Sequence, residues 1–576
     1  MLSKASISEV NVSVPAELGF LADLEVLSIF QTGLAGYIPS EIGMLSRLRH
    51  LQFSPGYNES SQFAFFGIPA PNAGLPGLIG SIPEELHSLL SLTSLDLSGN
   101  SLVRSIPTAL GLLTNLAHLD LERNQLTGNI PAELWSVDAL TSLDLSFNYF
   151  FPGPIPTDIG RLSKLSYLAL TASQLTGTLP SEVGRLANLT SLSMSWNSLF
   201  GPLPTEIGQL SKLSSLSFGG GQLSGPIPSE LWSLLSLTSL DLSYNNFANT
   251  RIPSQIGQLS KLLSLSLSAS QLTGRIPEEL RYLVNLIHLD LSANALVGPI
   301  PSQIASLSSL SVASLSGNQI TGPIPTWIGT LFNLTSLDIS WNLLEGPMPT
   351  EIGHLTKLSL LNFAGSLLTG PIPSEIGSLT NLTSIDISSN SFVGTIPTQI
   401  GHLLQLSYAN FAFNQLTGRI PADFWSLGSL TFLDLSSNSF VGTLLSDLGR
   451  LSSVEYLSLS INQFTGSIPS ELGSLTGLTS LSLSINNLTN TIPTELGELE
   501  SLQWLELSYN LLTGSVPSEL GRLSKLFYIA IDTNSLTGSL EGIFCPKRGI
   551  FYLQLSADCT LNCSCCEYCV NGTEFA

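Results

Sequence analysis

Hydrophobic and polar positions along the chain repeat with a period of 24 residues. Residues 92–115 read LTSLDLSGNSLVRSIPTALGLLTN, and an apolar residue, usually followed by proline, marks 22 such units between residues 14 and 540. Within the unit, leucines alternate with polar residues over LxxLxL. This alternation predicts a short strand in each unit, with Leu95 and Leu97 facing inward and Asp96 facing outward.

The rest of the unit predicts a tight return to the next strand. Asn100 can turn its amide inward to satisfy backbone groups that the turn leaves unpaired. One unit cannot bury its leucines alone, whereas stacked units share a continuous core. We therefore predict an α/β-type solenoid, a right-handed leucine-rich-repeat superhelix of about 22 repeats of 24 residues. Its parallel β-sheet is expected on the concave face, with mostly 3-10 or irregular structure on the convex side.

The repeat also resembles a known class of proteins. The stretch LTSLSLSINNLTNTIPTELG is similar to the plant-type leucine-rich-repeat class, which includes receptor-kinase ectodomains, receptor-like proteins and inhibitors of wall-degrading enzymes. The resemblance covers roughly residues 14–544 and implies the fold without identifying a ligand. The cysteine-paired N-terminal cap usual in that class is absent, and no kinase domain follows. The C-terminal run CSCCEYC looks like the tail of secreted repeat proteins from diatom-type algae.

The spacing predicts three segments: a leader (1–13), the solenoid (14–544) and a cysteine-rich cap (545–576). One step between units is 44 residues long and predicts an inserted loop at 54–80, rich in glycine and proline. Because zinc would need another well-spaced pair beside the C-x-x-C of Cys566 and Cys569, we expect disulfides that close the last unit, with 15 pairings open. The six cysteines are Cys545, Cys559, Cys563, Cys565, Cys566 and Cys569.

Composition excludes several classes of protein. The chain carries 42 acidic and 20 basic residues, a net charge of -22, and no basic stripe that would bind nucleic acid. Although 43% of residues are apolar, no uninterrupted apolar run is long enough to span a bilayer. The N-terminus lacks the apolar segment of a signal peptide, so the chain is either cytosolic or a trimmed form of a secreted protein. The cysteine cluster and the glycosylation motifs favour the second reading, secreted or cell-surface.

No catalytic or metal-binding motif occurs in the sequence. The six histidines are scattered, and there is no G-x-S-x-G, Walker or H-E-x-x-H motif. Calcium would need a converging loop of oxygen ligands, which we do not find. We therefore predict a protein that is not an enzyme and that needs neither metal nor cofactor.

Acidic residues recur at the outward position of the predicted strands. Three consecutive units carry aspartate there, and from Asp241 to Asp434 aspartate returns in every second unit. Duplication of a two-unit block, or solubility alone, would also produce this pattern. As candidate binding residues, these positions are Asp96, Asp120, Asp144, Asp241, Asp290, Asp338, Asp386 and Asp434.

Aromatic residues precede the repeat asparagine in several units. Phe147, Trp196 and Tyr244 are the preferred contact patch, and Trp341 occupies the same position further along. Rigid aromatic side chains of this kind contribute strongly to interfaces and can stack on sugars. Incidental packing is the alternative. The inserted loop adds a second candidate group, which could instead be a flap over neighbouring leucines: Phe63, Phe65 and Phe66.

The sequence contains eight Asn-x-Ser/Thr glycosylation motifs. Three of them occupy the same phase of the repeat, just before the strand, so that their sugars would project along one lateral edge. Such sugars would leave the strand face and the opposite edge available for contacts. The motifs are at Asn11, Asn58, Asn188, Asn333, Asn381, Asn487, Asn562 and Asn571.

These features favour an extracellular, non-enzymatic recognition scaffold. We expect it to bind a protein or glycan on the concave strand face of the solenoid. The alternative is a structural protein that self-associates in a wall, matrix or filament, which the regular two-unit repeat would suit. Ice- or mineral-surface binding is a third possibility, which the expected curvature argues against.

Overall fold

The computed structural model describes residues 13–30, 34–54, 77–545, 554–558, 560–564, 566 and 568–570. The chain divides into two compact units, an N-terminal unit (1–286) and a C-terminal unit (287–576). Asn11, Asn58, Asn571, Cys559, Cys565, the side chain of Cys569, and the loop aromatics Phe63, Phe65 and Phe66 lie outside the described residues.

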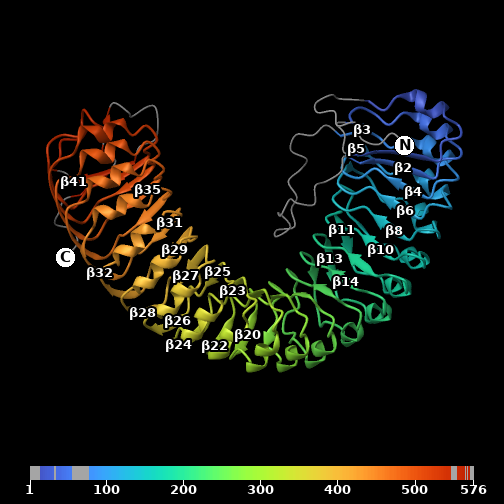
Figure 1. The fold of residues 1–576 in the computed structure, drawn as a ribbon. Coiled ribbons are helices and arrows are strands. Elements are labelled where there is room, and N and C mark those ends of the chain that lie inside the picture. The colour runs from blue at the N-terminus through green and yellow to red at the C-terminus, as the bar shows by residue number, and fades with distance from the viewer. Residues whose placement is uncertain are drawn as a thin grey trace. The chain divides into compact units, whose positions relative to one another are not determined.

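The LxxLxL segments form one long parallel sheet in the N-terminal unit (Figure 1). Neighbouring strands pair with equivalent residues opposite one another, so that Leu95 lies between Leu51 and Leu119. The strands are β1 (Val26–Phe30), β2 (His50–Ser54), β4 (Ser94–Asp96), β6 (His118–Asp120), β8 (Ser142–Asp144), β10 (Tyr167–Ala169), β12 (Ser191–Ser193), β14 (Ser215–Ser217), β16 (Ser239–Asp241) and β17 (Ser264–Ser266).

The C-terminal unit contains an equivalent run of parallel strands. Its register is equally regular, with Leu481 between Leu457 and Leu505. The strands are β19 (His288–Asp290), β21 (Val312–Ser314), β23 (Ser336–Asp338), β25 (Leu360–Asn362), β27 (Ser384–Asp386), β29 (Tyr408–Asn410), β31 (Phe432–Asp434), β33 (Tyr456–Ser458), β35 (Ser480–Ser482), β37 (Trp504–Glu506), β39 (Tyr528–Ala530), β41 (Gln554–Asp558) and β42 (Tyr568–Val570).

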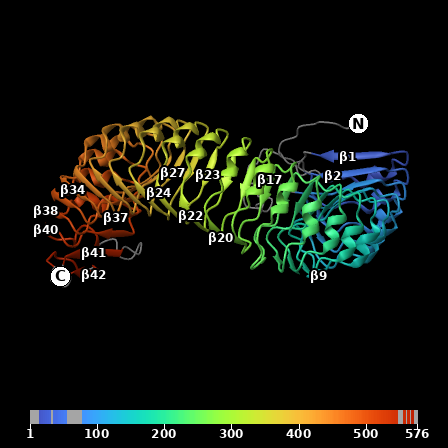
Figure 2. The same ribbon diagram turned by 90° about the horizontal axis from the view of Figure 1, so that it is seen from below.

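Short 3-10 helices return the chain after the proline step. Each helix begins directly after the proline, or after Leu445 in one unit, because the fixed φ of proline suits the extended residue before a helix. In each unit the helices lie on the face opposite the long sheet (Figure 2). The helices are η1 (Ala16–Phe20), η2 (Ser40–Met44), η3 (Glu84–Ser88), η4 (Thr108–Leu112), η5 (Ala132–Ser136), η6 (Thr157–Arg161), η7 (Ser181–Arg185), η8 (Thr205–Gln209), η9 (Ser229–Ser233), η10 (Ser254–Gln258), η11 (Glu278–Tyr282), η12 (Ser302–Ser306), η13 (Thr326–Thr330), η14 (Thr350–His354), η15 (Ser374–Ser378), η16 (Thr398–His402), η17 (Ala422–Ser426), η18 (Ser446–Arg450), η19 (Ser470–Ser474), η20 (Thr494–Glu498) and η21 (Ser518–Arg522).

A second, shorter set of parallel strands lies between the repeat asparagine and the proline step. Leu102 in β5 and Leu344 in β24 point into the core and are fully buried. These strands are β3 (Ile79–Gly80), β5 (Ser101–Arg104), β7 (Gln125–Leu126), β9 (Gly153–Pro154), β11 (Leu175–Gly177), β13 (Ser198–Gly201), β15 (Gln222–Leu223), β18 (Thr273–Gly274), β20 (Ala295–Gly298), β22 (Gln319–Pro323), β24 (Leu343–Pro347), β26 (Leu367–Gly370), β28 (Ser391–Gly394), β30 (Gln415–Gly418), β32 (Ser439–Thr443), β34 (Gln463–Gly466), β36 (Asn487–Asn490), β38 (Leu511–Ser515) and β40 (Ser535–Thr537).

The repeat asparagine joins each unit to the one before it, as the sequence predicted. Asn342 donates through Nδ2 to the carbonyls of Leu315 and Ile339, both at 3.0 Å, and its Oδ1 accepts the backbone N–H of Ile320 at 3.0 Å. These bonds pair backbone groups that the turn would otherwise bury unsatisfied. The inward leucines, such as Leu95 and Leu97, are fully buried, so the predicted solenoid is confirmed.

Both ends of the predicted loop segment belong to strands. Ser54 is the last residue of β2, and Ile79 and Gly80 form β3. The described chain resumes at residue 77, and the Leu78 backbone N–H then donates to Oδ1 of Asn100 at 2.9 Å. The regular pattern of the repeat therefore resumes by Leu78.

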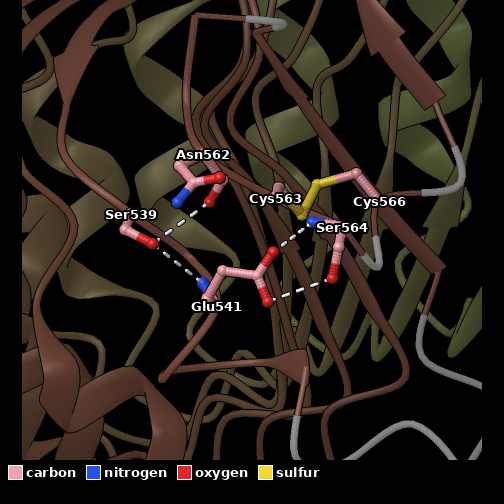
Figure 3. Close-up of a disulfide and its surroundings, with 6 residues drawn as sticks. All are labelled: Ser539, Glu541, Asn562, Cys563, Ser564 and Cys566. Atoms are coloured by element: carbon pink, nitrogen blue, oxygen red, sulfur yellow. Dashed lines mark hydrogen bonds between the residues drawn. A yellow bond between two sulfur atoms is a disulfide. The ribbon is translucent and has the colours of Figure 1, made fainter.

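The cysteine-rich segment is attached to the last repeat (Figure 3). A disulfide joins Cys563 to Cys566, and Ser564 between them donates through its backbone N–H and its Oγ to the Glu541 carboxylate, at 2.6 and 3.0 Å. Cys545 is also disulfide-bonded. Cys545, Cys563 and Cys566 are thus disulfide-bonded, while the role of the segment as a cap stays a prediction.

Candidate ligand-binding surface

The residue before the repeat asparagine adopts a left-handed backbone conformation. Its φ is 56° at Trp196, 53° at Tyr244 and 51° at Trp341, and glycine occupies the position in other units, as at Gly220. Glycine adopts this conformation without a steric penalty, whereas a bulky residue there is strained. The aromatic side chains are therefore present at this rim of the sheet despite a backbone cost.

Trp196 and Tyr244 form an aromatic platform over Gly220, which lies in the unit between them. Their ring centroids are 5.9 Å apart. A Cβ atom on Gly220 would come within 2.6 Å of the Trp196 ring, so the indole lies directly over this glycine. Trp196 is 41% exposed and Tyr244 is 53% exposed. The platform is thus an apolar surface at the edge of the strand face, about half of which is open to solvent.

The predicted patch of three aromatic residues divides into two parts. Phe147 lies against the Arg123 guanidinium, whose central carbon is 5.3 Å from the ring centroid. Trp341, in the C-terminal unit, repeats the other arrangement and lies over Gly365, where a Cβ would come within 2.6 Å of the indole. It is 64% exposed.

A hollow of about 350 Å³ lies beside the platform in the N-terminal unit. Trp196 forms one wall, and Ala172 is at the equivalent rim position of the preceding unit. Pro152, Gln174, Thr176, Asn197 and Ser198 complete the lining. The platform and hollow together offer apolar and hydrogen-bonding groups side by side.

Three carboxylates form a row along the strand face of the N-terminal unit. Asp96 lies opposite Asp120, and Asp120 lies opposite Asp144. The pKa of Asp120 is raised to about 7, mainly by burial and also by the negative charges of Asp144 and Asp96, while a hydrogen bond from the Glu122 backbone N–H lowers it. The pKa values of Glu122 and Asp144 are also raised, mainly by burial. This row favours protons or cations.

Neighbouring groups partly compensate this negative charge, among them the Gln52 side-chain amide, which donates to Oδ2 of Asp96 at 2.8 Å. Arg123 forms an ion pair with Glu122 at 2.9 Å. The Tyr167 hydroxyl donates to Oδ2 of Asp144 at 3.1 Å, and burial together with this carboxylate raises the pKa of Tyr167. Each of the described groups that compensate the row comes from a strand or turn directly beside it.

The alternating aspartates make local hydrogen bonds. Oδ1 of Asp338 accepts both the backbone N–H of Ser340, at 3.0 Å, and its hydroxyl, at 2.6 Å. The same pair of bonds recurs at Asp241, Asp290 and Asp386, while Asp434 accepts the backbone N–H of Ser436. These bonds give the repeated Asp-x-Ser a role in holding the turn after the strand.

An aromatic column on the C-terminal unit was missed by the sequence analysis. It occupies the first, outward position of strands β29, β31, β33, β37 and β39, where most other units carry serine. A comparison of this single position across the units would have found it. The column consists of Tyr408, Phe432, Tyr456, Trp504 and Tyr528, all half-buried.

Three glycosylation motifs occupy the same position of their repeats, one in the N-terminal unit and two in the C-terminal unit. The side-chain amides of Asn188, Asn333 and Asn381 each donate to a carbonyl of the preceding unit, at 2.8–3.0 Å. Asn115 and Asn285 make the same bond without being part of a motif. Asparagine therefore has a structural role at this position, and glycosylation stays a prediction. Asn487 and Asn562 are exposed.

Within the described ranges, no group of three or more histidine, cysteine, aspartate or glutamate side chains is arranged to hold a metal ion. The described part of the chain also contains no helix that is long and apolar enough to cross a membrane.

Family models of leucine-rich repeats match most of the solenoid. A leucine-rich repeat region matches residues 153–339, and leucine-rich-repeat models match residues 90–150, 380–440 and 476–536, with shorter matches at 139–162, 333–355 and 453–475. This protein belongs to the leucine-rich-repeat family. Among curated proteins, no sequence matches the chain.

Solved structures of plant receptors resemble the whole leucine-rich-repeat chain. The ectodomain of the Arabidopsis receptor kinase HAESA, in complex with an N-terminally extended IDA peptide hormone, is 31% identical, with a TM-score of 0.82 over 96% of this chain and 90% of that one. The plant peptide hormone receptor RGFR1, in complex with RGF2, is 30% identical, with a TM-score of 0.77 over 96% and 93% of the two chains. PEPR1 with AtPEP1 is 32% identical, with a TM-score of 0.77 over 93% and 75%.

Proposed function

We propose that this protein is an extracellular, non-enzymatic recognition scaffold whose strand face binds a protein or peptide ligand. The observation that carries the proposal is the platform of Trp196 and Tyr244, held over Gly220 at a rim position that costs backbone strain. Exposed aromatic side chains on a rigid element are typical anchors of protein interfaces. The matched receptor structures, several of them bound to peptide hormones, support a ligand of the same class.

The platform has the properties of an anchor site. Each aromatic side chain has two rotatable bonds, so little conformational entropy is lost when it is covered. The hollow beside Trp196 presents hydrogen-bonding groups of Gln174, Thr176 and Asn197 next to the apolar ring. A peptide that covers the platform could therefore place a side chain in this hollow and pair its polar atoms.

Two alternatives predict different ligands for the same surface. A glycan would stack a sugar ring on Trp196 and Tyr244, because aromatic faces also bind sugars. A self-assembling structural protein would use its own copies as the partner. Neither alternative accounts as directly as a peptide for a platform placed beside a polar hollow, and both are decided by the same experiment.

The experiment selects ligands for the full chain from libraries, so that the natural ligand need not be known in advance. A phage-displayed library of random peptides and an array of wall and matrix glycans are probed with the wild type and with the double variant Trp196→Ser/Tyr244→Ser. The matched control is Phe413→Ser, the same rim position in the C-terminal unit. We expect peptides that bind the wild type and the control, and that lose binding at least about tenfold with the double variant, because anchor residues of this kind contribute about 2 kcal/mol.

The contrary outcomes are specific. Glycans that bind through the platform, while no peptide does, would replace the proposal by the glycan alternative. A molar mass from light scattering that rises with concentration, and that the double variant returns to one chain, would replace it by self-association. Peptides that bind the wild type and the double variant equally would show that the platform is not the peptide-binding site.

A further inference from the structure

The aromatic column of the C-terminal unit is interrupted at one strand. Phe432 stacks on both neighbours, with ring centroids 4.5 Å from Tyr408 and 4.4 Å from Tyr456 and interplanar angles of 11° and 6°. Trp504 stacks on Tyr528 at 3.7 Å and 12°. The strand between these two stacks carries Ser480 at the same position.

The register places Ser480 directly between two aromatic faces. Ser480 is opposite Tyr456 on one side and opposite Trp504 on the other. Because the rings stack across neighbouring strands, their flat faces point along the column, and the faces of Tyr456 and Trp504 that border Ser480 are turned toward each other. We call this space over Ser480 the slot.

The width of the slot suits one planar group. Neighbouring strands are about 4.8 Å apart, so the two rings lie about 9.6 Å apart across two strand spacings. A planar group stacked between them needs a contact of about 3.5–4.0 Å on each face, or about 7–8 Å in all. A second planar group would need a third contact and would not fit.

Carboxylates border the slot. The Glu506 carboxylate accepts a hydrogen bond at 2.7 Å from Oγ of Ser482, which is two residues after Ser480 on the same strand. Burial raises the pKa of Tyr456, and the negative charges of Asp434 and Glu506, which lie near its hydroxyl, raise it as well. Strands β19 to β41 of the long sheet contain no lysine or arginine, whereas Asp290, Asp338, Asp386, Asp434, Glu506 and Asp558 lie in them.

We propose that the slot binds the guanidinium group of an arginine side chain, presented by the protein ligand of the strand face. This inference rests on the proposed function and adds the chemistry that the ligand must carry. Arginine is planar, stacks on aromatic faces and stays charged, and the negative faces of Tyr456 and Trp504 attract a cation between them. Its N–H groups, which lie in the plane of the guanidinium, can then reach Glu506.

Other occupants fit these features less well. Lysine is compact and strongly hydrated and has no plane to fill the slot. A neutral aromatic side chain could stack between the rings but would leave the negative charge of the carboxylates uncompensated. A sugar ring is thicker than a guanidinium and carries no positive charge. The combination of two facing rings and bordering carboxylates therefore favours arginine.

The experiment uses a defined probe, Nα-acetyl-arginine methylamide, titrated into the full chain labelled with 5-fluorotryptophan. Trp504→Phe identifies the Trp504 resonance among the 7 tryptophans. Ser480→Tyr fills the slot with the missing ring. The matched control, Ser384→Tyr, adds a ring beside Tyr408 at the outer end of the column, because Ser384 is opposite Tyr408, and leaves the slot open.

We expect a saturable shift of the Trp504 resonance in the wild type and in Ser384→Tyr, and none in Ser480→Tyr. The uncharged citrulline derivative, which has the same shape, should bind at least about fivefold more weakly, since the cation–π attraction is lost. The proposal is wrong if the arginine derivative gives no saturable shift, or if Ser480→Tyr responds like the wild type. It is also wrong if the citrulline derivative binds equally well or if methyl glucoside has an equal effect.

The outcome also separates this inference from the proposed function. Selected peptides without arginine, whose binding is insensitive to Ser480→Tyr, would contradict the slot and leave the scaffold function intact. If no peptide binds the chain at all, the proposed function fails, while the titration with the arginine derivative still decides whether the slot binds arginine.

Discussion

Oδ2 of Asp558 accepts a hydrogen bond at 3.1 Å from the backbone N–H of Asn534, and Oδ1 accepts the N–H of Thr533 at 2.6 Å. In the preceding unit the equivalent N–H groups reach carbonyls of the next unit, as Asn510 does with Thr533. Asp558 thus replaces with one carboxylate the two carbonyls that a further repeat would supply.

Removal of this carboxylate should loosen the end of the solenoid. In Asp558→Ala both N–H groups lose their partner, and we expect the free energy of local opening there to fall by about 2–4 kcal/mol. Hydrogen exchange at Thr533 and Asn534 measures this opening. Asp447→Ala, which removes an ion pair with the exposed Arg450, is the control and should leave exchange unchanged. Unchanged protection in Asp558→Ala would mean that water satisfies these groups equally well.

The buried hydroxyl of Ser366 has no hydrogen-bond partner and occupies a position where most units carry asparagine. Ser366→Asn should restore the bonds between units and raise the free energy of unfolding by about 1 kcal/mol, measured by urea denaturation. Ser173→Asn is the matched control, because Oγ of Ser173 already donates to the Leu145 carbonyl at 3.0 Å. An equal rise in the free energy of unfolding in both variants would contradict the view that the unpaired Ser366 hydroxyl is the cause.

The raised pKa of Asp120 makes stability depend on pH. Between the ordinary carboxyl value and about 7, the folded state binds more protons than the unfolded state, so stability falls as pH rises through this window. Asp120→Asn should raise the melting temperature at pH 8 and flatten this dependence. Asp290→Asn is the control, because Asp290 is opposite Ser314 and not another carboxylate. A wild-type melting temperature that rises between pH 5 and pH 8 would contradict this prediction.

Glycosylation at the lateral edge is testable by enzymatic release. For protein secreted from a eukaryotic host, peptide-N-glycosidase F should convert Asn188, Asn333 and Asn381 to aspartate, which mass spectrometry of peptides detects. Asn115 and Asn285 occupy the same repeat position without the motif and should remain unchanged. Unmodified asparagine at all three motifs would show that the amide bonds to the preceding unit are their only role.

The solenoid could be predicted from the chain because its determinants are local and repeated. A period of 24 residues, with leucines at strand spacing and an asparagine after each strand, specifies the same unit many times over. The roles of Leu95, Leu97 and Asn100 therefore followed from one unit. The rim aromatics were also visible, because each precedes an asparagine that marks its position.

The sequence by itself thus determined the repeat, its inward leucines and the rim at which Trp196 and Tyr244 lie. Only the tertiary structure decided which of these residues meet, because strand pairing brings together side chains that are 24 or 48 residues apart. It joined Trp196 to Tyr244 across Gly220 and gave Phe147 a different partner, Arg123. It likewise aligned five rings into a column and left a gap at Ser480, a relationship that exists only in the register of the sheet.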